Sequence, residues 1–152
     1  MPGKRQLIVD AVKARFAGIT QANGYQTDIG LKQTEWHPGP KSANPDDNEL
    51  PGHDIRDEVE RTVIENKNSG SYDRALEITV IAELKETTPG APLARKALED
   101  LIKAVGVDAT WGGLARRTLP VEDDISVDEL GQQVSAARLV FTVEYSRPPW
   151  RA

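Results

Sequence analysis

Two histidines and several carboxylates gather around one proline-rich segment, and they are the residues best suited to metal chemistry. His37 and His53 bracket the segment, and the carboxylates within reach are Asp46, Asp47, Glu49 and Asp54. Imidazole and carboxylate groups bind hard or borderline metals, so a small metal-dependent enzyme using residues 37–54 is one hypothesis. The histidines are not spaced for one helix face and no calcium-loop pattern is present, which favours a solvated acidic loop. We therefore expect no metal and no cofactor.

Other reactive groups are scarce in the sequence. The chain has no cysteine, which excludes thiol catalysis, disulfides and thiolate metal sites. It contains neither a Gly-x-Ser-x-Gly elbow nor a phosphate loop ending in Lys-Ser or Lys-Thr. Gly112-Gly113 precedes Leu114-Ala115-Arg116 rather than a helix that opens with a hydroxyl, so this glycine pair predicts a structural turn. These observations predict that the chain is not an enzyme.

Charge and hydropathy narrow the range of partners. The chain has 152 residues, within the range of one domain, and a net charge of −5, which disfavours a general grip on nucleic acid. Arg116-Arg117 is a basic pair, but neighbouring residues of a strand point to opposite faces, so we expect no specific nucleic-acid contact. No apolar run approaches the roughly 20 residues that cross a membrane, so we expect no membrane partner.

Three tryptophans lie outside the predicted core: Trp36 beside a loop, Trp111 in a turn and Trp150 in the tail. Exposed tryptophan is enriched at protein interfaces. For Trp111 we expect packing onto its own domain, whereas Trp36 and Trp150 are candidates for partner contacts. The full candidate interface comprises Trp36, His37, Asp46, Asp47, His53, Arg116, Arg117 and Trp150.

The N-terminal part of the chain predicts a helix, a strand and a long loop. Residues 5–20 have helical periodicity, with Ile8, Val9, Val12, Phe16 and Ile19 on one face. Asn23-Gly24 predicts the stop, and residues 27–36 alternate as a short strand. Residues 37–53 include Pro38, Pro40, Pro45 and Pro51, which excludes a regular ladder or helix. Whether a partner orders this exposed loop stays open.

The C-terminal part predicts strands and a second helix. Residues 55–66 and 76–84 are expected to pair as a hairpin around Asn68-Ser69-Gly70, and 116–122 and 137–145 form the last strands, joined by an acidic connection at 123–131. Residues 146–152 form a short tail. The helix at 92–105 has a predicted buried stripe of Ala94, Leu98, Leu101, Ile102 and Val105, with Ala97 at its edge and Asp100 among the exposed residues.

These patterns together predict an α+β fold, because each strand and each helix has one apolar face that needs cover. We expect a single mostly antiparallel sheet of four to five strands with two helices packed on one face.

The order of these motifs resembles the tail terminator (tail completion) proteins of long-tailed bacteriophages and prophages. The resemblance spans residues 6–145, apart from 38–51, and rests on LIVDAV (7–12), GYQTDIG (24–30), RALEITV (74–80), WGGL (111–114) and AARLVFTVEY (136–145).

The resemblance implies a structural virion-assembly protein without catalysis, present in the virion tail and assembled in the cytoplasm of a bacterial host. Such proteins close into a hexameric ring that caps the tail tube, ends its polymerisation and offers a surface for head joining. The implied partners are further copies of this chain, the tail-tube protein and the head–tail connector protein. Another head–tail adaptor or a tailocin tube component is an alternative, as is the metal-dependent enzyme.

Overall fold

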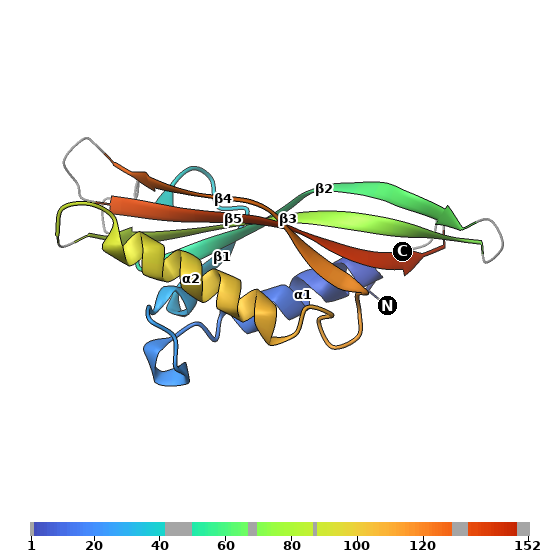
Figure 1. Ribbon diagram of the computed structural model, residues 1–152, viewed down its shortest axis with the longest axis horizontal. Helices are drawn as coiled ribbons and strands as arrows, with labels where there is room; N and C mark the ends of the chain where they lie inside the picture. Colours follow the sequence, from blue (N-terminus) through green and yellow to red (C-terminus); the bar gives the residue numbers. More distant parts are fainter. Residues whose placement is uncertain (1, 42–49, 67–69, 87, 129–133, 149–152) are drawn as a thin grey trace.

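The computed structural model describes residues 2–41, 50–66, 70–86, 88–128 and 134–148. It is an α+β structure with two α-helices, two short 3₁₀ turns and five strands (Figure 1). In chain order the elements are α1 (Lys4–Phe16), η1 (Gln21–Asn23), η2 (Ile29–Leu31), β1 (Gln33–Glu35), β2 (Gly52–Asn66), β3 (Ser71–Lys85), α2 (Pro92–Val107), β4 (Arg117–Val127) and β5 (Val134–Arg147).

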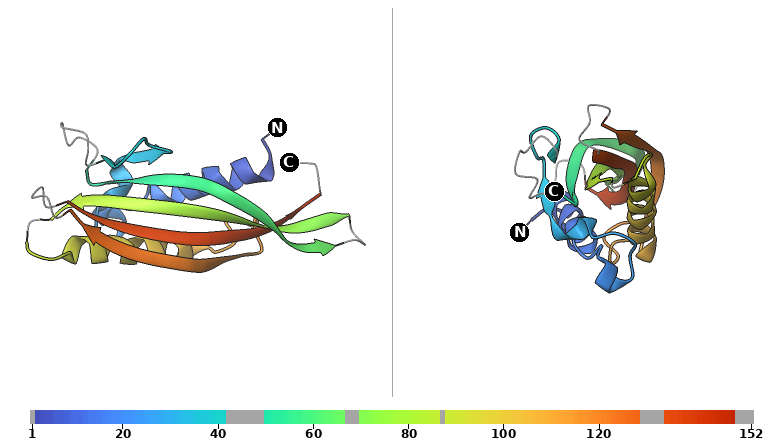
Figure 2. Two further views of the ribbon diagram at one scale, coloured as in Figure 1. Left: turned by 90° about the horizontal axis from the view of Figure 1, so that it is seen from above. Right: turned by 90° about the vertical axis from the view of Figure 1, so that its left-hand side faces the viewer.

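The strands form one twisted sheet in the order β1-β2-β3-β5-β4. β1 runs parallel to β2, and all other neighbours are antiparallel. Both helices lie on the same face of the sheet, with α1 toward the β1–β2 side and α2 toward the β4 side (Figures 1 and 2). The predicted single, mostly antiparallel sheet with two helices on one face is confirmed.

The core lies between the helices and the alternate residues of the two central strands. Ile78 of β3 stands opposite Phe141 of β5, and Phe16 of α1 meets Phe141 edge-on with ring centroids 6.2 Å apart. Alternate residues of both strands are buried, which confirms the expectation that each strand has one apolar face: Leu76, Ile78, Val80, Ala82, Leu84, Leu139, Phe141, Val143 and Tyr145.

The segment between α1 and β1 differs from the prediction. α1 ends at Phe16 rather than Thr20, and only Gln33–Glu35 of the predicted 27–36 strand is extended. The reason is a close backbone contact at Gly30, whose N–H donates to the Ile19 carbonyl at 2.9 Å. A Cβ at Gly30 would lie 2.7 Å from the backbone at Ile19, so only glycine fits here. The contact between the Gly30 and Ile19 backbones therefore takes the place of the strand pairing that we expected for this segment.

Helix α2 is rotated relative to the predicted stripe. Ile102, expected in the core, is 50% exposed, while Ala97 and Asp100 are buried. The buried position of Asp100 is explained by its carboxylate, which accepts the backbone N–H groups of Gln26 and Thr27. A hydrogen-bonded carboxylate takes the place that the apolar periodicity assigned to Ile102.

The last two strands are longer than predicted. β4 continues through the expected acidic connection to Val127, and β5 extends to Arg147, which pairs with Tyr72 of β3. Arg138 of β5 offsets the acidic run, because it binds Glu122 at 2.7 Å and Asp124 at 2.9 Å. The expected tail at 146–152 thus begins inside a strand. Among the described helices, none has the length and apolar character needed to cross a membrane.

Candidate interaction surface

Trp36 is a half-exposed aromatic residue that the surrounding chain holds in a fixed position. Its side chain is 49% exposed, and its backbone φ of 54° lies in the left-handed region that large residues rarely adopt. Its backbone N–H donates to the Ile55 carbonyl at 3.1 Å, and its indole N–H donates to Asp57 Oδ1 at 3.1 Å. Because hydrogen bonds fix both the backbone and the ring, the exposed indole would lose little conformational entropy on binding a partner.

A hollow of about 260 Å³ lies between the start of α1 and the β1–β2 edge, and one of its lining residues is Asp57, which holds the Trp36 indole. Its rim is charged but already paired, since Arg5 Nε lies 2.9 Å from Asp57 Oδ2 and Lys13 Nζ lies 3.0 Å from Glu35 Oε2. The hollow is lined by Gly3, Arg5, Gln6, Val9, Glu35 and Asp57. It is a recess that shares Asp57 with the Trp36 contact rather than a reaction site.

The edge of β2 continues past this hollow without a neighbouring strand among the described residues. β1 pairs with β2 only from His53 to Ile55, and no described strand lies along this side of β2 after that point. Val59 and Val63 are exposed there. We call the exposed residues Trp36, Val59 and Val63 the Trp36 edge.

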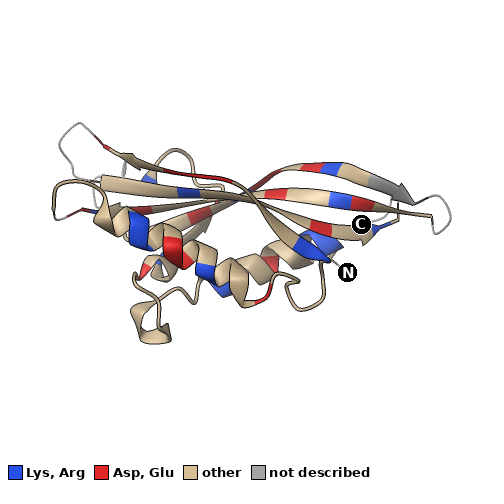
Figure 3. Ribbon diagram, in the orientation of Figure 1, with Lys and Arg blue, Asp and Glu red and all other residues tan. Residues whose placement is uncertain are grey.

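A second surface occupies the opposite end of the sheet, on β4. Three of its apolar side chains are exposed, namely Leu119, Val121 and Val127, and we call these with the neighbouring acidic residues the β4 edge. The acidic residues are Glu122, Asp123 and Asp124 (Figure 3). Pro120 lacks a backbone N–H, and a register shift follows it, so this edge is poorly suited to unrestricted strand pairing.

Arg116 and Arg117 lie where β4 begins, and both are already paired within the chain. Arg116 contacts the Asp73 carboxylate, and Arg117 Nε lies 2.5 Å from Glu144 Oε2 across the β4–β5 pair. The hydrogen bond to Glu144 raises the pKa of Arg117 above its ordinary value. Both guanidinium groups remain largely exposed, so they contribute charge to the start of β4.

His53 lies in the core, which corrects its place in the candidate interface. It is fully buried, its Nδ1 is 2.7 Å from the Ile29 carbonyl, and its Nε2 is 2.9 Å from the Gln33 amide nitrogen. A neutral ring with its proton on Nδ1 satisfies both contacts, and burial lowers the pKa of His53 to about 4. Neither nitrogen is left for a metal or a partner.

The remaining predicted site residues that the structure describes do not assemble into a metal centre. The ring of His37 is 3.1 Å from the Gly39 carbonyl. Asp46, Asp47 and Trp150 lie outside the described residues, as does the middle of the predicted loop. Within the described part of the chain, no group of three or more metal-binding side chains comes together.

A network centred on Asp54, which the sequence did not reveal, positions Trp36. Asp54 Oδ1 accepts the Thr34 hydroxyl at 2.7 Å and the His37 backbone N–H at 2.9 Å, while Oδ2 accepts Arg56 Nε at 3.0 Å. Arg56 also donates to the His37 carbonyl at 2.6 Å. The network ties the chain on both sides of Trp36 to β2. The signal in the sequence that could have indicated this network is the spacing of Asp54 and Arg56, which are two residues apart and so lie on one face of a strand.

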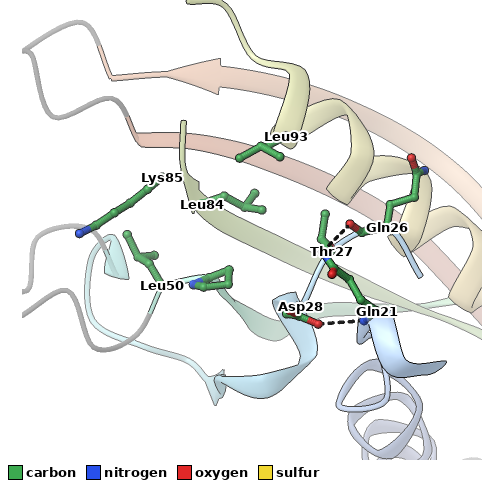
Figure 4. Close-up of a pocket in the computed structure, with 9 residues that line it drawn as sticks. Gln21, Gln26, Thr27, Asp28, Leu50, Leu84, Lys85 and Leu93 are labelled. Atoms are coloured by element: carbon green, nitrogen blue, oxygen red, sulfur yellow. Dashed lines mark hydrogen bonds between the residues drawn. The ribbon is translucent and has the colours of Figure 1, made fainter. Parts of the chain in front are cut away.

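A further pocket of about 210 Å³ lies between the η1–η2 segment, the end of β3 and the start of α2 (Figure 4). Its lining residues are Gln21, Gln26, Thr27, Asp28, Leu50, Pro51, Leu84, Lys85 and Leu93. The polar groups are largely engaged, because Asp28 accepts the Gln21 N–H at 2.8 Å and Thr27 donates to Asp100. No nucleophile stands beside a base among these described lining residues.

Trp111 packs onto its own domain, as predicted, but it belongs to the core from which its position in a turn had excluded it. It is buried and stacks on Phe141 with ring centroids 6.1 Å apart, and its indole N–H donates to Thr118 Oγ1 at 2.8 Å. The Arg15 guanidinium lies 3.9 Å from its ring centroid. This tryptophan closes the end of the core under β4 and β5 and offers no partner contact.

No family model and no curated protein matches the sequence. Among solved structures, the fold is similar to that of a chain from the structure described as the virion of a native gene transfer agent particle. The two chains share 10% sequence identity, the alignment covers 92% of this chain and 98% of that chain, and the TM-score is 0.46.

Proposed function

We propose that this chain is a tail terminator protein: a structural component that caps a phage-type tail tube, ends its polymerisation and provides the surface for head joining. It acts as a single domain without catalytic turnover, in the virion tail, after assembly in the cytoplasm of a bacterial host. Its partners are further copies of itself in a six-membered ring, the tail-tube protein and the head–tail connector protein.

One observation carries this proposal: the two exposed apolar surfaces lie at opposite edges of one sheet. The Trp36 edge lies on the β1–β2 side and the β4 edge on the far side. A ring needs two different surfaces on each subunit, so that every copy contacts the next by the same heterologous contact. A self-complementary dimer needs only one such surface.

The chemistry of the described residues gives no competing support for catalysis. His53 is enclosed by Phe16, Ile29 and Gln33, so the histidine pair of the metal hypothesis does not face a common site. Charged pairs such as Arg117 with Glu144 join neighbouring strands of the sheet. The order of the observed elements also agrees with the order of the motifs on which the resemblance rests.

The test is removal of the protein from a phage or tailocin that encodes it. We expect tails of uncontrolled length, or tails that fail to join heads, with restoration by the full chain supplied in trans. Electron microscopy of tail length and head attachment provides the measurement. Normal-length tails joined to heads in the absence of the protein would contradict the proposal. Normal-length tails without heads would favour another head–tail adaptor.

A further inference from the structure

We propose that the Trp36 edge of one copy receives the β4 edge of a second copy, and that Trp36 is the anchor of this contact. The inference rests on the proposed ring and adds the two surfaces from which the ring is built. It assigns a partner to the only half-exposed tryptophan in the described part of the chain.

The placement of the two surfaces fits a head-to-tail arrangement. β1 and β4 are the outermost strands of the sheet, and they lie on opposite sides when the sheet is seen from above (Figure 2). Neither edge has to meet its own counterpart, so the contact repeats from copy to copy until the rotation closes the ring.

Strand direction favours a second copy as the occupant. β2, β3, β5 and β4 alternate in direction across the sheet. When a second copy is placed beside the first without being turned end over end, its β4 therefore runs antiparallel to the first copy's β2. The uncovered stretch of β2 begins after Ile55, and β4 supplies 11 residues to lie along it.

The side chains of the two edges are also complementary. The Trp36 edge offers an indole and Val59, and the β4 edge offers Leu119 and Val121. Lys32 and Arg61 are exposed beside the Trp36 edge, Asp123 is exposed on β4, and none of the three forms an ion pair with another described residue. Glu58 is also exposed on β2 and repels the acidic residues of β4, which offsets part of this attraction. These charges therefore determine the register of the two strands more than the strength of the contact.

Both edges have irregularities that hinder ordinary strand pairing. The choice of partner therefore depends on the side chains of the two edges. β2 has register shifts between Arg56 and Val59 and between Thr62 and Ile64, and β4 has one at Pro120. Such irregular edges resist indiscriminate pairing with other sheets. A tryptophan held in a fixed position is the kind of residue that dominates the binding energy of a protein–protein contact.

The experiment uses disulfide cross-linking, because the natural chain has no cysteine. Full-length Val59→Cys and Val121→Cys variants are prepared separately, mixed, concentrated or loaded onto tail tubes, and oxidised. We expect a cross-linked dimer in the mixture and little in either variant alone. A mixture of Ile102→Cys with Val121→Cys is the control, because Ile102 is 50% exposed but lies on α2.

A second variant tests the anchor. Trp36→Asn removes the indole, and asparagine tolerates the left-handed backbone at this position. We expect self-association weaker by about 30-fold or more, the scale of a hot-spot residue, with an unchanged circular dichroism spectrum. Ile102→Gln is expected to leave association unchanged.

The outcomes separate this inference from the proposed function. A mixed cross-link together with weakened association of Trp36→Asn supports the inference. Rings that form without the mixed cross-link, or associate equally well without Trp36, overturn the choice of surfaces and leave the capping function standing. If no ring forms on tail tubes and tails are normal without the protein, both proposals are overturned.

Discussion

The carboxylate of Asp100 in α2 accepts the hydroxyl of Thr27 at 2.6 Å and the backbone N–H of Thr27 at 2.8 Å. It also accepts the backbone N–H of Gln26 at 3.0 Å, and Asp100 and Thr27 are both buried. One helix residue thus fixes the irregular segment that replaces the expected first strand. That segment in turn forms a wall of the pocket in Figure 4.

Replacement of Asp100 by alanine should therefore be strongly destabilising. It leaves buried N–H and hydroxyl donors without an acceptor, so we expect a loss of about 3 kcal/mol in the free energy of unfolding. Urea denaturation provides the measurement. Asp123→Ala, which removes an exposed carboxylate, should change stability by less than about 0.5 kcal/mol. Equal effects of the two substitutions would contradict the assigned role of Asp100.

The rotation of α2 can be tested by alanine substitutions in the helix, with Phe141 of β5 as a fully buried reference. Phe141→Ala should cost about 3–5 kcal/mol, because Phe141 is buried among Phe16 and Trp111. Leu98→Ala should cost about 1–2 kcal/mol, since Leu98 is only partly buried against the core. Ile102→Ala should cost less than about 0.5 kcal/mol. A cost at Ile102 above that at Leu98 in urea denaturation would restore the stripe expected from sequence.

The sequence was sufficient to predict the central strands. It was insufficient at the positions where polar contacts determine which residues are buried and how far a strand extends. Alternation placed Leu76 through Leu84 and Leu139 through Tyr145 correctly, because one buried face fixes the strand period. Periodicity misplaced Ile102, since a buried carboxylate with several donors is invisible to an apolar pattern. The same limit applies to β4, where pairing of Glu122 and Asp124 with Arg138 extends a strand through residues of low strand propensity.

The candidate surface was predictable only in part. The sequence identified Trp36 as a tryptophan outside the core, but not its tether to Asp57, which joins residues distant in sequence. It placed His53 with the loop, although the residue belongs to β2 and points into the core opposite Ala82. A histidine at a loop boundary has no local signal that tells which side of the boundary it joins.

His53 should make stability dependent on pH. Its pKa is about 4 in the folded chain and about 6.5 when unfolded, so the unfolded state binds the proton first as the pH falls. Stability contributed by the neutral ring is complete above pH 6.5 and is lost progressively down to about pH 4, by about 3 kcal/mol. Urea denaturation across this range should show the slope, and His53→Gln should remove much of it. His37→Gln should leave the slope intact, and a flat wild-type profile would contradict the assignment.

Glu60 should hold the far end of the hairpin to the last strand. Its nearly covered carboxylate lies 3.0 Å from Arg74 Nε and 3.2 Å from an Arg147 nitrogen, and it also accepts the Tyr145 hydroxyl. Burial tends to raise the pKa of Glu60, but these hydrogen bonds outweigh it and the pKa is lowered. Glu60→Gln leaves two partly buried arginines without their shared anion, so we expect a loss of about 3 kcal/mol at neutral pH.

Because the folded pKa of Glu60 is below the ordinary value, its contribution to stability is present above that ordinary value. It is lost as the pH falls through the lowered pKa, where the native carboxylate takes up its proton. The difference between wild type and Glu60→Gln in urea denaturation should therefore shrink toward acid pH. Glu77→Gln, on the outer face of β3, serves as the control and should differ little from wild type at any pH. A difference for Glu60→Gln that stays constant from neutral to acid pH would mean that its charge does not stabilise the strand end.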